Sequence, residues 1–431
     1  MRFLMVTHGS AGDLLPFLRI GRELAGRGHE IMVLADGSCG AVIERAGLSF
    51  VPTSDASPAT AYSSAPDLLG AARPAQLREV YLRHGLFEQV RREAEALVRL
   101  HRHDETVLVG RHTSAASVLF AAEVLGSTAC WVAVSPAQLQ VVPLAVGHVE
   151  TALAEGFNAV RARVGLLPVS DWRAWFGSPD GVLGLWPRWF DVAGTRAPAG
   201  VDLAGFVLGD DLSPPGGEAR PEDTVAVTLP DPSAVLVTGG TGRMLNPAFY
   251  SSAIDAVAAA GRPAIVVTPH RDLLARRLPG CVTWLPEAPF ALMLPHVAAI
   301  VHHGGIGTAV RALRCGTPQV ILADGADRPD NARRLAARGL ASWLDPARWS
   351  PADIGAALTE RLSSRDRSRS SPAPELELES GPRRAAEALE ALPPTAGPAQ
   401  RLRRQLALLS PEQRRRLGRR LPAAGSGEAG R

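Results

Sequence analysis

The chain has 431 residues, of which 46% are hydrophobic and 21% are charged, and its formal net charge at pH 7 is +3. A chain of this length can bury more than one core, so about two domains are expected. The small net charge argues against a nucleic-acid partner and against electrostatic binding to a membrane surface.

Apolar runs and amphipathic segments alternate through the first 135 residues. Residues 3–7 predict a strand, residues 14–27 a helix, and residues 30–34 the next strand. A turn with two glycines, residues 8–13, connects the first strand to the helix. This order is the βαβ unit of a parallel sheet. The pattern continues with a helix over 91–102, a strand over 107–109, a helix over 114–125 and a strand over 129–134.

The alternation is interrupted twice and then restarts. Residues 136–195 are less periodic and rich in Trp, Pro and Gly, which is typical of loops that line a cleft. Residues 209–233 are rich in Pro, Gly and charge and predict a linker. Two α/β halves joined in this way bind a ligand between them, at the carboxyl ends of strands. After the linker we expect strands over 234–238, 264–267, 297–301 and 319–322, a glycine-rich turn over 239–242 and a helix over 249–260.

The strand over 297–301 leads into a turn that contains two histidines and three glycines, and a helix follows over 308–315. Glycines let the backbone approach a ligand, and the first N–H groups of a helix are unpaired and partly positive. This arrangement predicts a cradle for a phosphate or diphosphate, with His303 as a hydrogen-bond donor beside it. The alternative is that His303 is a core histidine that ends a strand. We expect His302 to be structural.

The composition changes again near the C-terminus. Residues 363–381 are rich in Arg, Ser, Pro and Glu without a packable pattern, which predicts a flexible excursion. Residues 383–392 predict a short amphipathic helix, and a basic tail with a helical segment over 411–421 follows.

Several short motifs follow one another along the chain, at residues 9–17, 186–190, 238–242, 284–287, 302–308, 316–319 and 327–331. Their order and spacing together make the chain similar to the inverting nucleotide-sugar glycosyltransferases of family 1 type. The likeness is to bacterial enzymes that decorate natural products and to rhamnosyltransferase-like and sterol-glucosyltransferase-like relatives. It covers about residues 1–362 and 383–392. The resemblance implies an α/β fold of the GT-B type, with two Rossmann-like domains that face each other across a cleft and a flexible basic C-terminal tail.

The resemblance also divides the chain into functional segments. The acceptor pocket is expected in the irregular N-terminal segments, about 55–85 and 136–180. The expected segments are an acceptor-binding domain (1–208), a linker (209–233), a nucleotide-sugar-binding domain (234–362), the flexible excursion (363–381), a helix that packs back on the fold (382–393) and the basic tail (394–431).

In such enzymes an acceptor hydroxyl attacks the anomeric carbon of a nucleoside-diphosphate sugar in one inverting displacement. The reaction needs a base near the acceptor and positive potential around the diphosphate. Asp13 stands at the family's catalytic Asp position, so the resemblance implies that Asp13 is the general base. His8 is the rival base, and Ser10 would position the acceptor or the carboxylate. The alternative for Asp13 is that it caps the following helix.

On the donor side, His303 matches the histidine that binds the diphosphate. Trp284 matches the aromatic residue that stacks on the base, and Glu287 lies where the family often has a ribose-contacting Gln. The complete implied donor set is Gly240, Thr241, Trp284, Glu287, His303, Gly305, Gly307, Thr308, Asp327 and Arg328.

Two arginines depart from the family pattern. Arg311 stands eight positions after His303, where many relatives grip both ribose hydroxyls with an acid. A 2′-deoxyribose offers no such pair, so Arg311 favours a dTDP-sugar, with UDP- and GDP-sugars as alternatives. Arg328 stands where relatives have a sugar-reading amide, and a guanidinium accepts no hydrogen bond. It could contact a phosphate, an acidic or a carbamoylated sugar, or turn outward.

The resemblance therefore predicts a hexosyltransferase-type enzyme that uses no metal and no cofactor besides its nucleotide-sugar co-substrate. Its acceptor would be a small natural product, lipid or peptide-like molecule. The alternatives are a catalytically silent homologue that acts as an auxiliary or scaffold protein, and a nucleotide-sugar epimerase of the same fold. Four cysteines without metal spacing, no signal sequence and no apolar run of membrane-spanning length predict a cytoplasmic location and no stable membrane insertion. Weak docking of the tail to a biosynthetic partner is a further expectation.

Overall fold

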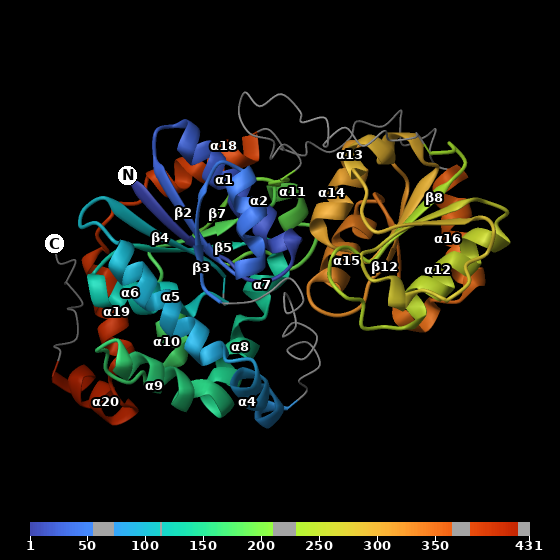
Figure 1. Cartoon of the computed structure of the whole chain (residues 1–431). Helices are drawn as coiled ribbons and strands as arrows, with labels where there is room; N and C mark the ends of the chain where they lie inside the picture. Colours follow the sequence, from blue (N-terminus) through green and yellow to red (C-terminus); the bar gives the residue numbers. More distant parts are fainter. Residues whose placement is uncertain (55–72, 113, 210–229, 364–379, 421–431) are drawn as a thin grey trace, which may run out of the picture.

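The computed structural model describes residues 1–54, 73–112, 114–209, 230–363 and 380–420. Two β-sheets, one in each half of the chain, form the framework of the molecule (Figure 1). The N-terminal sheet has seven strands in the order β3-β2-β1-β4-β5-β6-β7, and the C-terminal sheet has six in the order β10-β9-β8-β11-β12-β13. All strand pairs in both sheets are parallel, which confirms the α/β class and the two Rossmann-like halves.

The N-terminal half carries seven strands, and helices precede or follow most of them. The strands are β1 (Arg2–Val6), β2 (Glu30–Ala35), β3 (Ser49–Pro52), β4 (Thr106–Arg111), β5 (Ala129–Ala133), β6 (Gly181–Gly184) and β7 (Val201–Leu203). The helices are α1 (Ala11–Gly26), α2 (Gly40–Arg45), α4 (Pro74–Arg83), α5 (Leu86–Leu100), α6 (Ala116–Leu125), α7 (Pro136–Gln140), α8 (Val142–His148), the π-helix η2 (Val149–Leu153), α9 (Ala154–Arg163), α10 (Trp172–Phe176) and α11 (Arg188–Asp191).

The C-terminal half repeats the alternation, and the chain then ends in further helices. The strands are β8 (Val235–Thr238), β9 (Ala264–Val267), β10 (Val282–Leu285), β11 (Ala299–His302), β12 (Gln319–Leu322) and β13 (Ser342–Leu344). The helices are α12 (Ala248–Ala259), α13 (Phe290–Met293), α14 (Ile306–Arg314), α15 (Arg328–Ala337), α16 (Pro351–Ser363), α18 (Ser380–Glu390), α19 (Pro398–Leu408) and α20 (Pro411–Arg420).

The central strands are short apolar runs because helices cover both faces of each sheet. Every residue of β1 is buried. Phe3 and Met5 pack in a core with α1, α2 and α18, whereas Leu4 and Val6 pack on the other face with α5 and α6. The alternating direction of side chains along a strand thus divides one sequence run between two cores.

Apolar packing and one buried arginine join the two halves. Trp186, Phe190 and Phe206 of the N-terminal half share a core with Ala309 and neighbouring residues of α14 and α15. Arg334 of α15 has a fully buried side chain. It donates hydrogen bonds to backbone oxygens that include that of Phe190, at 2.9 Å. The other two oxygens of the N-terminal half that accept from Arg334 belong to Asp191 and Thr195, each at 2.7 Å.

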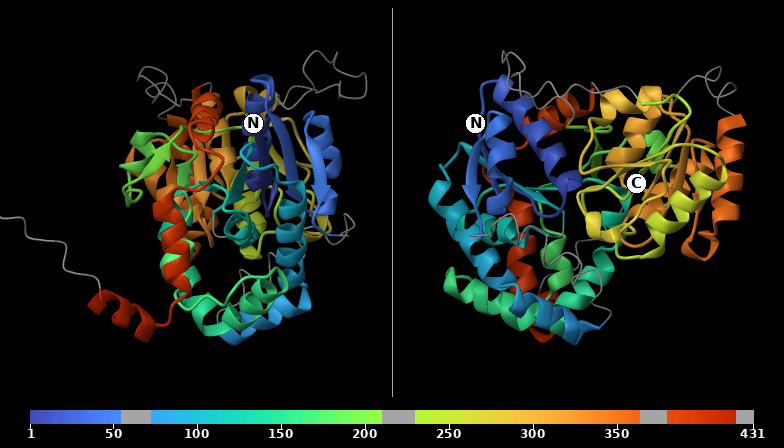
Figure 2. Two further views of the ribbon diagram at one scale, coloured as in Figure 1. Left: turned by 90° about the vertical axis from the view of Figure 1, so that its left-hand side faces the viewer. Right: turned by 45° about the vertical axis from the view of Figure 1, so that its right-hand side comes forward.

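Helix α19, in the expected flexible tail (394–431), packs on the N-terminal half, as does α18 before it, where a helix that packs back on the fold was expected. Helix α18 packs against α1, and α19 packs against α10, so both lie along the N-terminal half (Figure 2). Arg404 of α19 is only 2% exposed and pairs with Asp180 at 2.8 Å. The sequence predicted a flexible basic tail over 394–431, but this arginine finds a carboxylate and three backbone oxygens in the N-terminal half.

Two further expectations differ from the structure in detail. Residues 136–195 are largely helical rather than irregular, because several short helices (α7 to α11) follow one another there. Helix α1 begins at Ala11 rather than at residue 14, so Asp13 lies in its first turn and not in the turn before it. Most of the expected linker and of the flexible excursion lies outside the described residues. None of the helices in the described segments is long and apolar enough to span a bilayer.

Candidate active site

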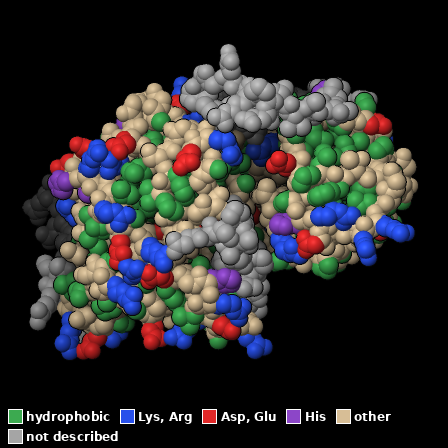
Figure 3. Space-filling model, in the orientation of Figure 1, with side chains coloured by type: hydrophobic (Ala, Val, Ile, Leu, Met, Phe, Trp, Pro, Cys, Tyr) green, Lys and Arg blue, Asp and Glu red, His purple; other side chains and the backbone are tan. Residues whose placement is uncertain are grey.

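The polar turns singled out in the sequence follow the central strands of the two sheets. Strand β1 lies between β2 and β4, so the strand order reverses beside it, and residues 8–10 follow its end. Strands β8 and β11 are neighbours in the other sheet, and the turns 239–242 and 303–305 follow them. Such switch points are where open parallel sheets bind ligands. The molecular surface is hollowed where the two halves meet (Figure 3).

His8 is held by a buried carboxylate from α5. Its Nε2 lies 2.7 Å from Oε1 of Glu93, whose side chain is completely buried, and its Nδ1 lies 3.2 Å from the hydroxyl of Ser114. Glu93 also accepts hydrogen bonds from Gln89 at 3.0 Å and from Ser117 at 2.7 Å. These donors fix the carboxylate, and the imidazole remains 21% exposed.

The partners of His8 decide which ring nitrogen carries the proton in the neutral imidazole. A carboxylate can only accept, so Nε2 of His8 donates to Glu93. Nδ1 then has the free lone pair and accepts from the Ser114 hydroxyl. This hydroxyl has a second acceptor at 3.5 Å, the carbonyl oxygen of Arg111, so another hydroxyl could replace it at Nδ1. The arrangement can therefore remove a proton from a bound alcohol.

Both carboxylate oxygens of Asp13 have partners. Oδ1 accepts from Nε of Arg111 at 2.7 Å, and Oδ2 accepts from the backbone N–H of Ser10 at 3.0 Å. The second contact is half of a capping box, which stabilises the start of α1. Gly9 has φ +109°, and a Cβ there would lie 2.3 Å from Oδ2 of Asp13, so this turn requires glycine. Asp13 and His8 lie in the same turn region, but their side chains contact different partners.

The phosphate cradle is built around His303. A Cβ added to Gly240 would lie 2.7 Å from Cε1 of His303, and one added to Gly305 would lie 2.4 Å from its Nε2, so both glycines leave room for the ring. His303 is 8% exposed, and its Nδ1 has no hydrogen-bond partner among the described residues. Burial, the charge of Arg328 and the neighbouring His302 hold the pKa of His303 well below 6.5. The ring is therefore neutral at pH 7.

Helix α14 begins directly after this turn. Gly305 is its N-cap residue, and the N–H groups of its first turn have no partner within the helix. Gly307 and Thr308 lie in this first turn, and Thr308 is buried. The turn thus brings orphan N–H donors, a hydroxyl and an imidazole together, which suits a phosphate group.

His302 is structural, as expected. It is completely buried at the end of β11. Its Nδ1 accepts from the backbone N–H of Gly304 at 3.2 Å, so its Nε2 carries the proton and donates to Gln319 at 3.0 Å. Burial lowers its pKa to about 4.

The residues expected to contact the nucleoside lie at the end of β10. Trp284 is partly buried, and its indole N–H donates to the carbonyl oxygen of Thr268 at 2.9 Å. Arg271 lies over its ring at 5.8 Å from the centroid. Glu287 is exposed just beyond the strand. On the opposing loop, the carbonyl oxygen of Thr241 lies 3.2 Å from Nε2 of His270.

Asp327 and Arg328 occupy the start of α15. Asp327 is its N-cap residue, and Oδ2 of Asp327 accepts from the side-chain amide of Asn331 at 3.0 Å. Arg328 is partly buried, and its Nη1 lies 3.3 Å from the carbonyl oxygen of Asp324 and 3.5 Å from the sulfur of Met244.

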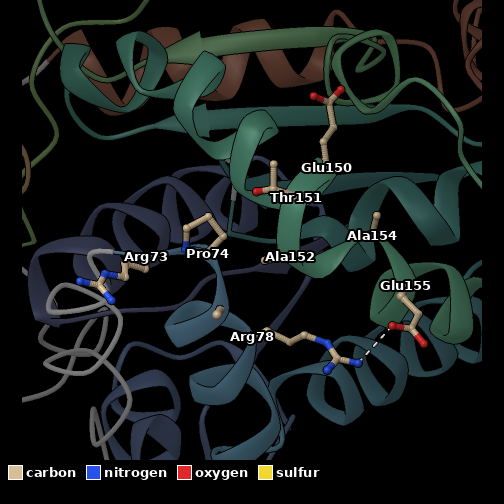
Figure 4. Close-up of a pocket in the computed structure, with 9 residues that line it drawn as sticks. Arg73, Pro74, Arg78, Glu150, Thr151, Ala152, Ala154 and Glu155 are labelled. Carbon is tan, nitrogen blue, oxygen red and sulfur yellow. Dashed lines mark hydrogen bonds and ion pairs between the residues drawn. The ribbon is translucent and has the colours of Figure 1, made fainter.

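A cavity of about 850 Å³ opens between α4 and η2 (Figure 4). Arg73 and Arg78 lie on one side, and Glu150 and Glu155 come from the other, with Arg78 and Glu155 paired at 3.1 Å. All of its lining residues fall within the segments 55–85 and 136–180, where the resemblance implied an acceptor pocket. Its volume lies within the range that is usual for small-molecule sites.

Sequence reasoning missed Glu93, Arg111 and Ser114. Glu93 is the one with a detectable signal, because it lies on the same face of α5 as the buried Val90 and Leu97. A carboxylate on an apolar helix face predicts a buried polar partner. In the described part of the chain, no group of three or more His, Cys, Asp and Glu side chains could hold a metal ion.

Comparisons with known proteins identify relatives of the chain in sequence and in fold. A family model described as erythromycin biosynthesis protein CIII-like, C-terminal domain, matches residues 251–391. The elloramycin glycosyltransferase of Streptomyces olivaceus is 30% identical to the chain over 366 residues, which are 79% of this chain and 85% of the relative.

Solved structures share the fold over nearly the whole chain. The glycotransferase of kitacinnamycin superposes with a TM-score of 0.63 at 24% identity, and the match covers 91% of this chain and 99% of the other. A spinosyn rhamnosyltransferase complexed with thymidine diphosphate gives a TM-score of 0.58 at 20% identity, with coverage of 94% and 100%. The chain therefore belongs to the family 1 natural-product glycosyltransferases, antibiotic-type enzymes of the GT-B fold that depend on nucleotide-sugar donors.

Proposed function

We propose that this enzyme transfers a sugar, with inversion, from a nucleoside-diphosphate sugar to a hydroxyl group of a small acceptor, and that His8 is the general base. The observation that carries the assignment is the pair formed by His8 and the buried Glu93, which leaves the lone pair of Nδ1 for an acceptor.

The contacts favour His8 over Asp13, the base that the sequence resemblance implied. Oδ1 of Asp13 is in an ion pair with Arg111, and Oδ2 accepts from Ser10 at the start of α1. A proton taken from an acceptor would neutralise the Asp13 carboxylate and so weaken its ion pair with Arg111. Among the described residues, the hydrogen-bond partner of His8 Nδ1 is the hydroxyl of Ser114, which an acceptor hydroxyl can replace.

In the proposed reaction the oxygen of the acceptor hydroxyl forms a bond to the anomeric carbon as the bond from that carbon to the diphosphate breaks. The hydroxyl proton moves to Nδ1 of His8, and the electrons of the broken bond remain on the diphosphate. The carboxylate of Glu93 then lies beside an imidazolium and stabilises its charge, as a buried acid does behind a catalytic histidine.

The donor would occupy the turns around His303 and Gly240, with its base near Trp284 and Glu287 and its sugar near Asp327. Orphan N–H groups at the start of α14 and the hydroxyl of Thr308 would hold the diphosphate. A thymidine diphosphate complex of a solved relative and the residue Arg311 both support a dTDP-sugar.

The acceptor would reach its site through the segments that line the 850 Å³ cavity between α4 and η2. Residues 55–72, part of the expected acceptor pocket, lie outside the described part of the chain. Mixed charge around the cavity, from Arg73, Arg78, Glu150 and Glu155, suits an acceptor that carries polar groups as well as an apolar frame.

A transfer assay tests the proposal. Purified enzyme is incubated with dTDP-α-glucose, UDP-α-glucose or GDP-α-glucose and a panel of alcohol and phenol acceptors, and products are analysed by mass spectrometry and NMR. We expect a β-glycoside, because inversion converts the α-linked donor. An α-glycoside would contradict inversion. Donor epimerisation without an acceptor would favour an epimerase, and a failure of every nucleotide to bind would favour a silent homologue.

A further inference from the structure

Arg328 is a cation in the donor region that lacks a carboxylate partner. Among the described residues no Asp or Glu oxygen lies within 4.0 Å of its guanidinium, and its contacts are the carbonyl oxygen of Asp324 and the sulfur of Met244, both made by Nη1. A guanidinium has five N–H donors, and those on Nε and Nη2 have no hydrogen-bond acceptor in the described protein.

The two carboxylates nearest in the sequence hold amide groups instead. Oδ2 of Asp324 accepts from Asn246 at 3.1 Å, and Oδ2 of Asp327 accepts from Asn331 at 3.0 Å. The charges of Asp327 and Asp324 stabilise the guanidinium from a distance, but burial outweighs them and lowers the pKa of Arg328. Burying such a charge is costly, so a counter-charge from a ligand would stabilise it.

The position of Arg328 shows where such a ligand would lie. Met244 contacts Nη1 of Arg328, and its sulfur lies 3.2 Å from the place of a Cβ at Gly239, so the Met244 side chain connects Arg328 to the first glycine turn. The backbone oxygen of Arg328 lies 3.1 Å from the place of a Cβ at Gly304, so it also borders the second turn. His303, between these turns, has an unpartnered Nδ1 and is 92% buried.

We propose that Arg328 is a second anion-binding group of the donor site, and that it binds a negatively charged oxygen beyond the first phosphate, either on the β-phosphate or on an acidic substituent of the sugar. The inference rests on the proposed function of the two glycine turns as the donor site. An arginine carries charge and only donates, whereas an amide both donates and accepts, so this position selects an anion over a neutral sugar hydroxyl.

If the anion is the β-phosphate, Arg328 also acts on the leaving group. Negative charge grows on the diphosphate as its bond to the anomeric carbon breaks, and a fixed guanidinium beside it stabilises that charge. His303 is neutral and adds no positive charge, whereas Arg328 and the partly positive N-terminus of α14 would both contribute to it.

Binding measurements on Arg328→Gln test the inference. Calorimetric affinities for dTMP, dTDP, UDP-glucose and UDP-glucuronate are compared in the wild type, Arg328→Gln, the charge-retaining Arg328→Lys and the control Arg333→Gln. Arg333 lies on the same helix but is exposed over Trp343, so its change removes the same charge away from the turns. Thermal unfolding of each variant checks that it is folded.

A β-phosphate contact predicts that Arg328→Gln weakens dTDP by about tenfold or more and dTMP by less than about twofold. A sugar-acid contact predicts that the ratio of dTDP to dTMP affinity stays the same, while the preference for UDP-glucuronate over UDP-glucose falls by a similar factor. In either case Arg328→Lys keeps most of the wild-type affinity for the anion, and Arg333→Gln binds all four ligands as the wild type does.

Two results would overturn the inference, and they are distinguishable. If Arg328→Gln leaves both ratios within about twofold of the wild type, Arg328 binds no donor anion although the donor site is real. If the wild type itself binds none of the four ligands, the proposed donor site is wrong and the inference fails with it.

Discussion

Nε2 of His8, at the end of β1, and Oε1 of Glu93, in the middle of α5, lie 2.7 Å apart although 85 positions separate them in the chain. The contact joins a turn at the switch point of the sheet to a helix that covers one sheet face. Because the carboxylate is completely buried and has two further donors, it can hold the imidazole in one tautomer and one orientation.

Replacing Glu93 by glutamine should therefore impair transfer through the tautomer of His8. The side-chain amide introduced by Glu93→Gln can donate to Nε2, which would move the imidazole proton to Nδ1 and block the proposed base atom. We expect kcat for an aliphatic alcohol acceptor to fall on the order of a hundredfold or more, with little change in donor affinity. Steady-state kinetics and calorimetry with dTDP measure the two effects.

Ser117→Ala is a matched control for that variant, because it removes one hydrogen bond to Glu93 and leaves the carboxylate in place. Its kcat should stay within about tenfold of the wild type. If Glu93→Gln has the kcat of the wild type, the carboxylate does not act through His8.

His302 should make the stability of the protein depend on pH. Burial lowers its pKa to about 4 from 6.5, so the unfolded chain binds the proton first as the pH falls. Neutral His302 makes its full contribution to the free energy of unfolding above about pH 6.5. This free energy falls by about 3 kcal/mol in total as the pH drops from about 6.5 to about 4. His302→Asn keeps an acceptor for the N–H of Gly304 but cannot be protonated there. Urea unfolding of both proteins at pH 7.5, 6 and 5 measures the difference.

We expect His302→Asn to be less stable at pH 7.5 and the gap to the wild type to shrink as the pH falls. The exposed His103 provides a control, since His103→Asn should track the wild type at every pH. A gap that stays constant from pH 7.5 to 5 would show that His302 is not the group that titrates.

Arg404 should contribute strongly to stability although it lies in the segment that the sequence predicted to be a flexible basic tail. Arg404→Ala removes the ion-pair partner of Asp180, whose side chain is only 8% exposed. Removing one partner of a buried pair costs about 3–5 kcal/mol. The change Arg403→Ala, at an exposed position of the same helix, should lower the free energy of unfolding by less than about 0.5 kcal/mol. Equal losses for both variants in urea unfolding would mean that α19 is not docked.

The regular elements were largely predictable, because local patterns determine them. The strands over 264–267 and 319–322 have the predicted bounds, and the β1 unit is shifted by a few residues. Helix α1 begins early because Ser10 and Asp13 have capping-box spacing, a signal that the sequence contained.

The partners within the site were less predictable, because they come from distant parts of the chain. No local pattern connects His8 to Glu93 or Arg404 to Asp180, since both contacts depend on how helices pack on the finished sheet. For the same reason the sequence resemblance favoured Asp13 as base without revealing that Arg111 pairs with it.

The most direct test of His8 as the base compares two acceptors in the variants His8→Ala and Asp13→Asn. One acceptor is an aliphatic alcohol, which must lose its proton during transfer, and the other is a nitrophenol that is already ionised at the assay pH. We predict that His8→Ala lowers kcat for the alcohol at least about a hundredfold but keeps kcat for the nitrophenol within about tenfold, whereas Asp13→Asn affects both acceptors alike. Equal losses for both acceptors in His8→Ala, or a selective loss for the alcohol in Asp13→Asn, would contradict the assignment.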